Sequence, residues 1–399
     1  MEPKFYRKVL KNGMTLVLEK RDLPIVSVAF AVRCGGINES SGEKGISHFI
    51  EHLLYKGTPK RSSKQIAEQI ERNGGILNGF TDETVTAFWC KLPSSKLPIA
   101  LDVLSDMIKN PLFDQKEMDK ERKVIFEEIK LYRNTPHYHI YNEIQKVMYK
   151  EPFGKPLIGT EKTLNSITRE KVLQRFRQVY QPNNMILCVV GDADFSQLVK
   201  FTEKNFGKGM GTVPKYRVFE KNSSKIEKRK GIDQANIVFG YHIPKSKSKE
   251  NYAAFVLNTV LAGGMSSRLF SEIREKRNLA YSLKGNSMIM KDYAFSTIYC
   301  GAKKENINLI KEIILKEFQK VSKELGEKEL KEVKEQIIGN HQISLEDSNN
   351  QMINLLINEI DDSAKKAYEF MKKIKAVKLK DVKNLAKIKK YSFFALVPE

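Results

Sequence analysis

His48-Phe49-Ile50-Glu51-His52 is the stretch of this sequence from which both its fold and its chemistry can be argued. Residues four apart on a helix share a face, so His48 and His52 can reach one metal ion together. Glu51 lies on the same turn. The alternative is a pair of helix-face histidines without a metal. Only six histidines occur among the 399 residues, and finding two at this spacing favours the metal site.

The third metal ligand must come from another part of the chain, because a catalytic zinc ion takes three protein ligands and keeps one position open. We predict that this ligand is Glu128. It lies in residues 121–129, whose apolar pattern indicates a buried helix with one solvent-exposed edge. Glu121 shares that edge, seven positions earlier. Glu127 is rotated by about a hundred degrees on an ideal helix and is the weaker candidate, although chemistry alone does not exclude it.

The order of the pentapeptide, with Glu before the second His, is the inverted form of the common zinc peptidase motif. The chain resembles the pitrilysin-like (inverzincin, M16) zinc metallopeptidases, especially the short two-domain members related to mitochondrial processing peptidase. The resemblance is carried by residues 12–13, 42–53, 56–58, 74–81, 159–160, 180–185 and 190–192, which together extend over most of residues 5–195.

The resemblance implies a zinc-dependent endopeptidase that binds one Zn2+ per chain through His48, His52 and Glu128. Glu51 would then be the general base that accepts a proton from the attacking water. Glu121 would act from the second coordination sphere, where a carboxylate orients a ligand.

The resemblance also implies an edge strand that pairs with extended substrate. This strand is expected at residues 76–80, after a Gly-Gly turn, with Asn78, Gly79 and Phe80 as the substrate-binding residues. Gly79 stands where the family usually has alanine. Pairing through the backbone would explain tolerance of many peptide sequences.

The second half of the chain contains Gly-Gly-Met-Ser-Ser-Arg-Leu-Phe at 263–270, followed by Arg274 and Tyr281. An isolated Arg and Tyr near a helix end would more often be an ordinary surface pair. In this context the two resemble the family's Arg and Tyr, which bind the substrate carbonyl and stabilise the oxyanion.

An internal repeat predicts the fold class, which is α+β. Residues 62–72 parallel residues 266–276 at a constant offset of 204, and each copy leads to a strand-like segment and an amphipathic helix. We therefore expect two homologous α/β-sandwich domains, each a mostly antiparallel sheet packed with helices. The resemblance makes them half of a clamshell. The predicted ranges are a zinc-binding domain at 1–210, a linker at 207–232 rich in Gly, Ser and charge, and a metal-free domain at 233–399.

Net charge and cysteine use restrict the remaining function classes. The net charge of +21 would be compatible with a nucleic-acid partner, but many lysines alternate with acidic residues along predicted helices and no nucleic-acid motif is present.

The chain has four cysteines, and their spacing is not that of a disulfide framework. They are predicted to be buried thiols: Cys34, Cys90, Cys188 and Cys300. His137 and His139 alternate like loop or strand neighbours, and a second metal site there is disfavoured.

The amino-terminal residues lack a signal or transit pattern, and no apolar run is long enough for a membrane span, so we expect a cytoplasmic protein without a membrane partner.

The resemblance to family members of this size implies a homodimer, or a heterodimer with a paralogous chain, in which Arg274 and Tyr281 serve the zinc site of the partner chain. The leading prediction is an oligopeptidase for unfolded peptides. The alternatives are a presequence-processing peptidase and a non-catalytic core subunit.

Overall fold

The computed structural model describes residues 4–399, which form two compact units of three chain segments each. Each unit contains a mixed β-sheet with helices packed against it. The first unit comprises residues 4–129, 156–217 and 344–367, and the second comprises residues 130–155, 218–343 and 368–399. The predicted α+β class is confirmed.

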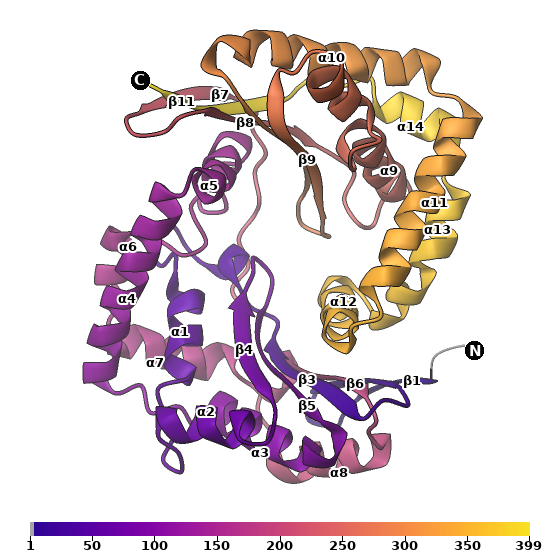
Figure 1. The fold of residues 1–399 in the computed structure, drawn as a ribbon. Coiled ribbons are helices and arrows are strands. Elements are labelled where there is room, and N and C mark those ends of the chain that lie inside the picture. Colours follow the sequence, from indigo (N-terminus) through magenta and orange to yellow (C-terminus); the bar gives the residue numbers. More distant parts are fainter. Residues whose placement is uncertain (1–3) are drawn as a thin grey trace. The chain divides into compact units, whose positions relative to one another are not determined.

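The first unit is built on a six-stranded sheet with the order β1-β2-β6-β3-β5-β4 (Figure 1). Strands β2 and β6 run parallel, and every other neighbouring pair is antiparallel. The central strands β3 and β6 are almost entirely buried, which explains their predominantly apolar sequences. The strands are β1 (Lys4–Val9), β2 (Thr15–Lys20), β3 (Ile25–Val32), β4 (Ile76–Thr81), β5 (Thr86–Pro93) and β6 (Met185–Gly191). The predicted edge strand at 76–80 is therefore confirmed as β4.

Helices cover both faces of this sheet, and Figure 1 shows α3 and α8 on one face and α12 on the other. Among residues 4–399, no helix is both long and apolar enough to cross a bilayer. The helices of this unit are α1 (Ile46–Leu54), α2 (Ser63–Glu71), α3 (Leu97–Lys109), α4 (Gln115–Asn134, which continues into the second unit), α6 (Glu161–Asn165), α7 (Arg169–Val179), α8 (Phe195–Asn205) and α12 (Ser348–Asp361).

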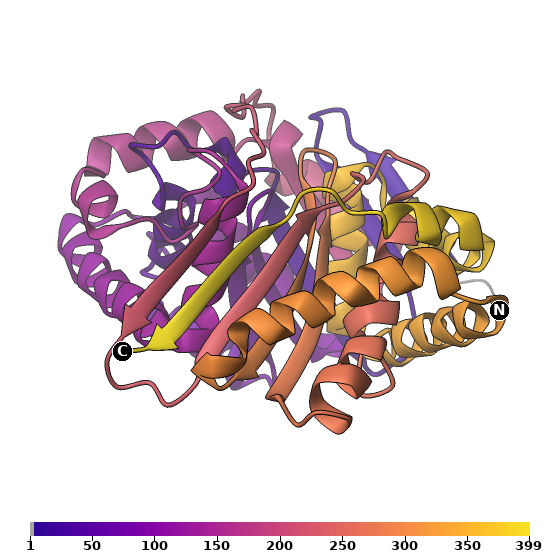
Figure 2. The same cartoon turned by 90° about the horizontal axis from the view of Figure 1, so that it is seen from above.

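The second unit repeats the sheet of the first with one strand fewer, in the order β7-β11-β8-β10-β9. Its single parallel pair is β7 with β11, which matches β2 with β6, and Figure 2 shows the yellow strand β11 between β7 and β8. The strands are β7 (Ser224–Arg229), β8 (Ala235–His242), β9 (Ala280–Ile289), β10 (Ala294–Ala302) and β11 (Ser392–Pro398). Strand β7 lies inside the stretch 207–232, so this part of the predicted linker is wrong and belongs to the sheet.

The helices of the second unit follow the same plan. Helix α9 packs on β9 and β10 as α1 packs on β4 and β5, and the π-helical turn η4 follows α9 as α2 follows α1. The helical elements are α5 (Pro136–Met148), α9 (Asn251–Ala262), η4 (Phe270–Glu275), α10 (Ile307–Glu324), α11 (Glu327–Ser344), α13 (Phe370–Ala376) and α14 (Leu379–Leu385).

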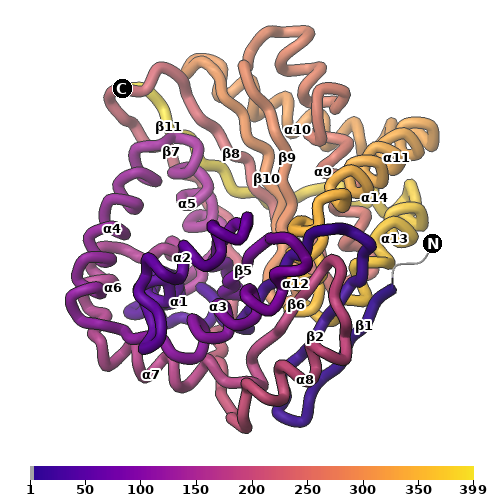
Figure 3. Tube along the Cα trace, turned by 60° about the horizontal axis from the view of Figure 1, so that its bottom comes forward, coloured from indigo at the N-terminus to yellow at the C-terminus, as the bar shows by residue number. Residues whose placement is uncertain are grey.

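Each sheet is also covered by a helix from the other half of the sequence. Helix α12 packs on β3 and β6 in the first unit (Figure 3), and α5 packs on the corresponding strands β8 and β11 in the second. His137 and His139 lie in α5, so the prediction that they sit in a loop or strand is wrong. Pro136 occupies the first turn, where its missing N–H costs nothing.

Helix α12 is tied to the first sheet by a buried carboxylate. Glu359 accepts hydrogen bonds from Arg7 Nε and Nη2, both at 2.8 Å, and from Arg33 Nη2 at 3.0 Å. Burial alone would raise the pKa of Glu359, but the hydrogen bonds from Arg7, the Ala364 N–H and Arg33 hold it below its ordinary value. A charge pair of this kind is costly to break.

We predict that Glu359→Gln lowers the free energy of unfolding near neutral pH by about 3 kcal/mol, because two guanidinium groups lose their counter-charge. Denaturant titration followed by circular dichroism measures this. The wild-type contribution is complete above the unfolded-state pKa of about 4.3 and is lost as the pH falls through the lower folded-state pKa. The mutant and wild type should therefore converge in acid.

The matched control is Glu335→Gln, because Glu335 lies 3.9 Å from Lys331 in an exposed pair on α11. It should change stability by less than about 1 kcal/mol. Equal losses in the two variants would contradict the role given to Glu359.

Candidate metal centre

A buried carboxylate fixes the start of helix α1. Glu39 accepts hydrogen bonds from the backbone N–H groups of Gly45 at 3.0 Å and Ser47 at 2.7 Å, two donors without a partner inside the helix. Gly45 has φ +96°, and a Cβ there would lie 2.5 Å from the carbonyl oxygen of Ile158, so only glycine fits this turn. The first metal-site residue, His48, follows one position after Ser47.

The charge of Glu39 is itself compensated inside the protein. Burial raises its pKa, while the charge of Lys44 and the hydrogen bonds at the helix start oppose the shift. Lys44 is fully buried, donates to the carbonyl oxygen of Gly36 at 2.6 Å and lies 3.8 Å from Glu83 Oε2. The loop before α1 is therefore held by paired buried charges, which makes the position of the helix end well defined.

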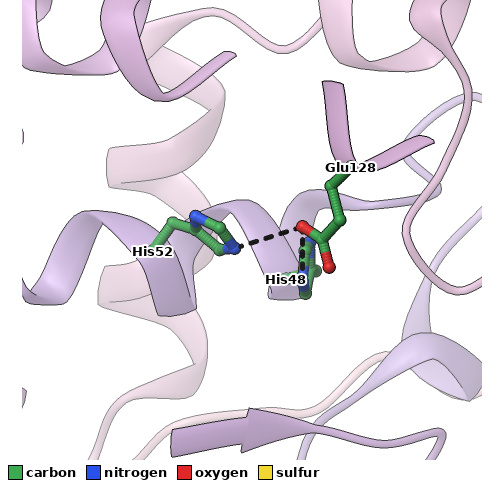
Figure 4. A group of neighbouring side chains, drawn as sticks. All are labelled: His48, His52 and Glu128. Atoms are coloured by element: carbon green, nitrogen blue, oxygen red, sulfur yellow. Dashed lines mark ion pairs between the residues drawn. The ribbon is translucent and has the colours of Figure 1, made fainter. Parts of the chain in front are cut away.

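The structure brings His48, His52 and Glu128 together (Figure 4). Glu128 Oε2 lies 3.8 Å from His48 Nε2 and 3.6 Å from His52 Nε2, and one ligand atom of each residue falls within 4.8 Å of the others. Donors that each sit about 2 Å from one zinc ion must be separated by roughly this much. Glu127, the other carboxylate considered, is an exposed residue of α4 and is outside this group.

The protonation of His48 suits a metal. Burial, together with the nearby His52, lowers the pKa of His48 to about 3, so its imidazole is neutral at neutral pH and offers a lone pair. Two imidazole nitrogens and one carboxylate form a donor set of the kind found in catalytic zinc sites. The residues present therefore fit a zinc ion.

A second carboxylate orients His52. Glu121 Oε2 lies 3.1 Å from His52 Nδ1, and Glu121 Oε1 accepts from Lys56 Nζ at 2.6 Å. Burial alone would raise the pKa of Glu121, but the bonds from His52 and Lys56 hold it below its ordinary value. A carboxylate on Nδ1 leaves Nε2 of His52 as the free donor atom and fixes the ring.

Glu51, on the same helix as the two histidines, is held by the neighbouring strand. Thr81 Oγ1, on β4, donates to Glu51 Oε2 at 2.6 Å. Burial raises the pKa of Glu51 and the Thr81 bond partly offsets this, so the carboxyl group is a stronger base than an exposed one.

Strand β4 runs beside α1 and forms the edge of the sheet (Figure 1). Asn78, Gly79 and Phe80 pair with Trp89, Phe88 and Ala87 of β5, and the opposite side of β4 meets no other strand of the described chain. An extended peptide can add to such an edge through backbone hydrogen bonds.

Arg274 and Tyr281 belong to the second unit. The Arg274 guanidinium lies over the ring of Phe270 within η4, 5.1 Å from its centroid, and Tyr281 is a largely exposed residue of β9. Both are near the ends of their elements, with side chains accessible to a ligand.

Sequence reasoning missed Lys56 and Thr81 as site residues. Lys56 stands four residues after His52, a spacing that a helical argument could have used. Thr81 closes the segment 74–81 but reaches Glu51 only because β4 packs on α1, which no local pattern reveals.

Two family models match the chain in succession. Residues 15–161 match the insulinase model (peptidase family M16), and residues 166–337 match the model described as the peptidase M16 inactive domain. A crystal structure of a protease from Helicobacter pylori superposes with a TM-score of 0.92 at 22% identity, covering 99% of this chain and all of the other. An M16-like peptidase from Alicyclobacillus acidocaldarius gives a TM-score of 0.86 at 18% identity, and the match covers 100% of this chain and 99% of the other. At these identities the likeness concerns the fold.

Sequence relatives extend over nearly the whole chain. An uncharacterized zinc protease of Bacillus subtilis is 33% identical over 387 residues, which cover 96% of this chain and 94% of the relative. An uncharacterized zinc protease of Rickettsia felis is 31% identical, and the match covers 85% of this chain and 84% of the relative. With both family domains in order and a histidine pair beside a carboxylate in the first, the chain belongs to peptidase family M16, the insulinase family.

Proposed function

We propose that this protein is a zinc-dependent endopeptidase that hydrolyses unfolded peptides. The observation that carries the proposal is the group of His48, His52 and Glu128 on two adjoining helices, with Glu51 held beside it. The names of the sequence relatives, zinc proteases, agree with this chemistry.

In this proposal His48, His52 and Glu128 hold one zinc ion per chain, and Glu121 keeps the His52 ring in place. A bound zinc ion would supply Lewis acidity and lower the pKa of a water molecule to about 7. Glu51 accepts the proton of the attacking water and delivers it to the departing amine.

The substrate would lie along β4 as an added strand. Pairing through the backbone of Asn78, Gly79 and Phe80 requires an extended chain, which selects unfolded peptides and places few demands on their sequence. The scissile carbonyl would then pass near Glu51, because Thr81 of the same strand bonds this carboxylate.

The oxyanion would be stabilised by Arg274 and Tyr281, donors of the type used for developing negative charge. We propose a homodimer, or a heterodimer with a paralogous chain, in which this pair serves the metal centre of the partner chain. The family resemblance supports this assembly, with each chain as half of a clamshell.

A non-catalytic core subunit is the alternative from a different class. One solved chain of similar fold, at a TM-score of 0.86 and 18% identity, comes from complex III of Candida albicans. Presequence processing is an alternative within peptidases, although a net charge of +21 would repel basic presequences. The complete set of donor residues and the buried base favour a peptidase over a core subunit.

Glu128→Gln should weaken zinc binding by more than about 100-fold, since even residues that only orient ligands contribute 10- to 100-fold. Competition with a chromophoric chelator measures the affinity, and elemental analysis should find one zinc per wild-type chain. Glu127→Gln is the matched control, one position along the same helix, and should bind zinc like the wild type. A larger loss in the control would assign the ligand to Glu127.

Glu51→Gln should keep the zinc and lower kcat by about 10²- to 10⁴-fold, because a neutral amide cannot accept the proton. Mass spectrometry of a mixed pool of unstructured peptides, incubated with zinc-loaded proteins, gives the rates. Wild-type turnover retained in the zinc-loaded variant would remove Glu51 from the mechanism. Zinc-loaded wild type that cleaves none of the peptides would favour the non-catalytic subunit.

Mixing Glu51→Gln protein with Tyr281→Phe protein under subunit exchange tests the assembly. If the pair acts on the partner chain, each mixed dimer contains one site with both a native base and a native tyrosine, so activity should return. Peptide cleavage after confirmed exchange is the measurement, and each variant mixed with itself is the control. Mixed dimers as inactive as either parent would place Tyr281 at the zinc site of its own chain.

A further inference from the structure

Gly79 of β4 faces the end of the zinc-site helix at a distance that leaves no room for a side chain. A Cβ at this position would lie 2.5 Å from the hydroxyl oxygen of Tyr55 and 2.9 Å from the carbonyl oxygen of Ala87. Gly79 does not have a positive φ, so the restriction is one of space. The atom that approaches most closely is the Tyr55 hydroxyl.

Tyr55 is the residue that ends α1, one turn beyond Glu51. Its ring packs against Phe88 of β5, with centroids 5.8 Å apart, which fixes the direction of the side chain. Its hydroxyl is buried and has no hydrogen-bond partner among residues 4–399. An unpaired buried hydroxyl is unfavourable by about 1–3 kcal/mol, so one is retained at a site only with compensation.

The carboxylate of Glu51 lies next to the same point. Glu51 Oε1 is 3.5 Å from the Cβ position of Gly79, while Oε2 accepts the hydrogen bond from Thr81. One oxygen of the proposed base is therefore held by Thr81, and the other shares its surroundings with the Tyr55 hydroxyl. No other hydrogen bond to the side-chain carboxylate of Glu51 occurs among residues 4–399.

We propose that the Tyr55 hydroxyl is a positioning group for Glu51, and that residue 79 is glycine because this hydroxyl occupies the space of a side chain there. The inference rests on the proposed role of Glu51 as the base. Thr81 then holds one oxygen of the carboxylate by a hydrogen bond, and the Tyr55 hydroxyl limits the space next to the other oxygen at Gly79 of β4.

Tyr55→Phe removes the hydroxyl and keeps the ring. It should lower kcat about tenfold with KM within about twofold, since a base that is less well oriented transfers protons more slowly while the strand edge still binds peptide. Zinc content should stay at the wild-type level. Thermal stability should be unchanged or higher, because a buried unpaired group is lost. Tyr241→Phe, which removes a buried hydroxyl bonded to Asn258 in the second unit, should leave kcat unchanged.

A double-mutant cycle tests whether the Tyr55 hydroxyl and a side chain at position 79 compete for the same space. It is measured by melting temperature and does not require peptidase activity. Gly79→Ala should lower the melting temperature, and part of this loss should disappear in the Tyr55→Phe background, with the remainder due to the Ala87 carbonyl. Gly75→Ala, whose Cβ would meet Ile70 and Leu92 at 3.0 Å or less, is the control that Tyr55→Phe should not rescue.

Either of two outcomes overturns the proposal. If Tyr55→Phe keeps the wild-type kcat, the hydroxyl does not position the base. If Gly79→Ala is as damaging in both backgrounds, the two residues do not compete for one space. A zinc-loaded wild type without peptidase activity would overturn the proposed function and the positioning role together, and the stability cycle would still report whether Tyr55 occupies the space at Gly79.

Discussion

The hydrogen bonds from the Gly45 and Ser47 N–H groups to Glu39 are the constraint on which the candidate metal centre depends. A helix end is free to fray unless its donors find partners, and a buried carboxylate satisfies two of them while matching the helix dipole. The cost of burying Glu39 is offset by Lys44. Because α1 is fixed at its first turn, His48 and His52 are presented at a defined rotation, and a single carboxylate on α4 suffices to complete the donor group.

The repeated architecture places the candidate metal centre in the first of two similar units. Both sheets share strand order and direction, and each takes a covering helix from the other half of the chain, α12 on β3 and β6, and α5 on β8 and β11. An amphipathic sequence pattern shows that such a helix has an apolar face, but it does not show which of the two sheets that face covers. A single domain boundary near residue 210, predicted from sequence, therefore does not describe units that each combine three separate chain segments.

Local spacing predicted most of the donor group, and long-range packing determined the rest. His48 and His52 follow from helical periodicity, and Glu128 rather than Glu127 follows from the rotation between neighbouring residues on α4. The contacts of Thr81 and Tyr55 with the surroundings of Glu51 depend on how β4 lies against α1, so they could not be read from spacing. The α5 histidines were misassigned because Pro136 was not used as a helix-start signal.

A close approach between a helix and the edge strand is common to both units, α1 with β4 in the first and α9 with β9 in the second, and only its chemistry differs. In the second unit, a Cβ at Gly285 of β9 would lie 2.9 Å from the Asn258 amide and 3.0 Å from Ala262 Cβ of α9. In the first unit, the same kind of contact brings Gly79 to Tyr55 and Glu51. The glycine leaves room for a polar side-chain atom in both copies, the Tyr55 hydroxyl in the first unit and the Asn258 amide in the second, whereas a carboxylate lies beside this point only in the first. The Glu51 carboxylate distinguishes this contact from its counterpart in the second unit, and the proposed role of Glu51 as the base accounts for that difference.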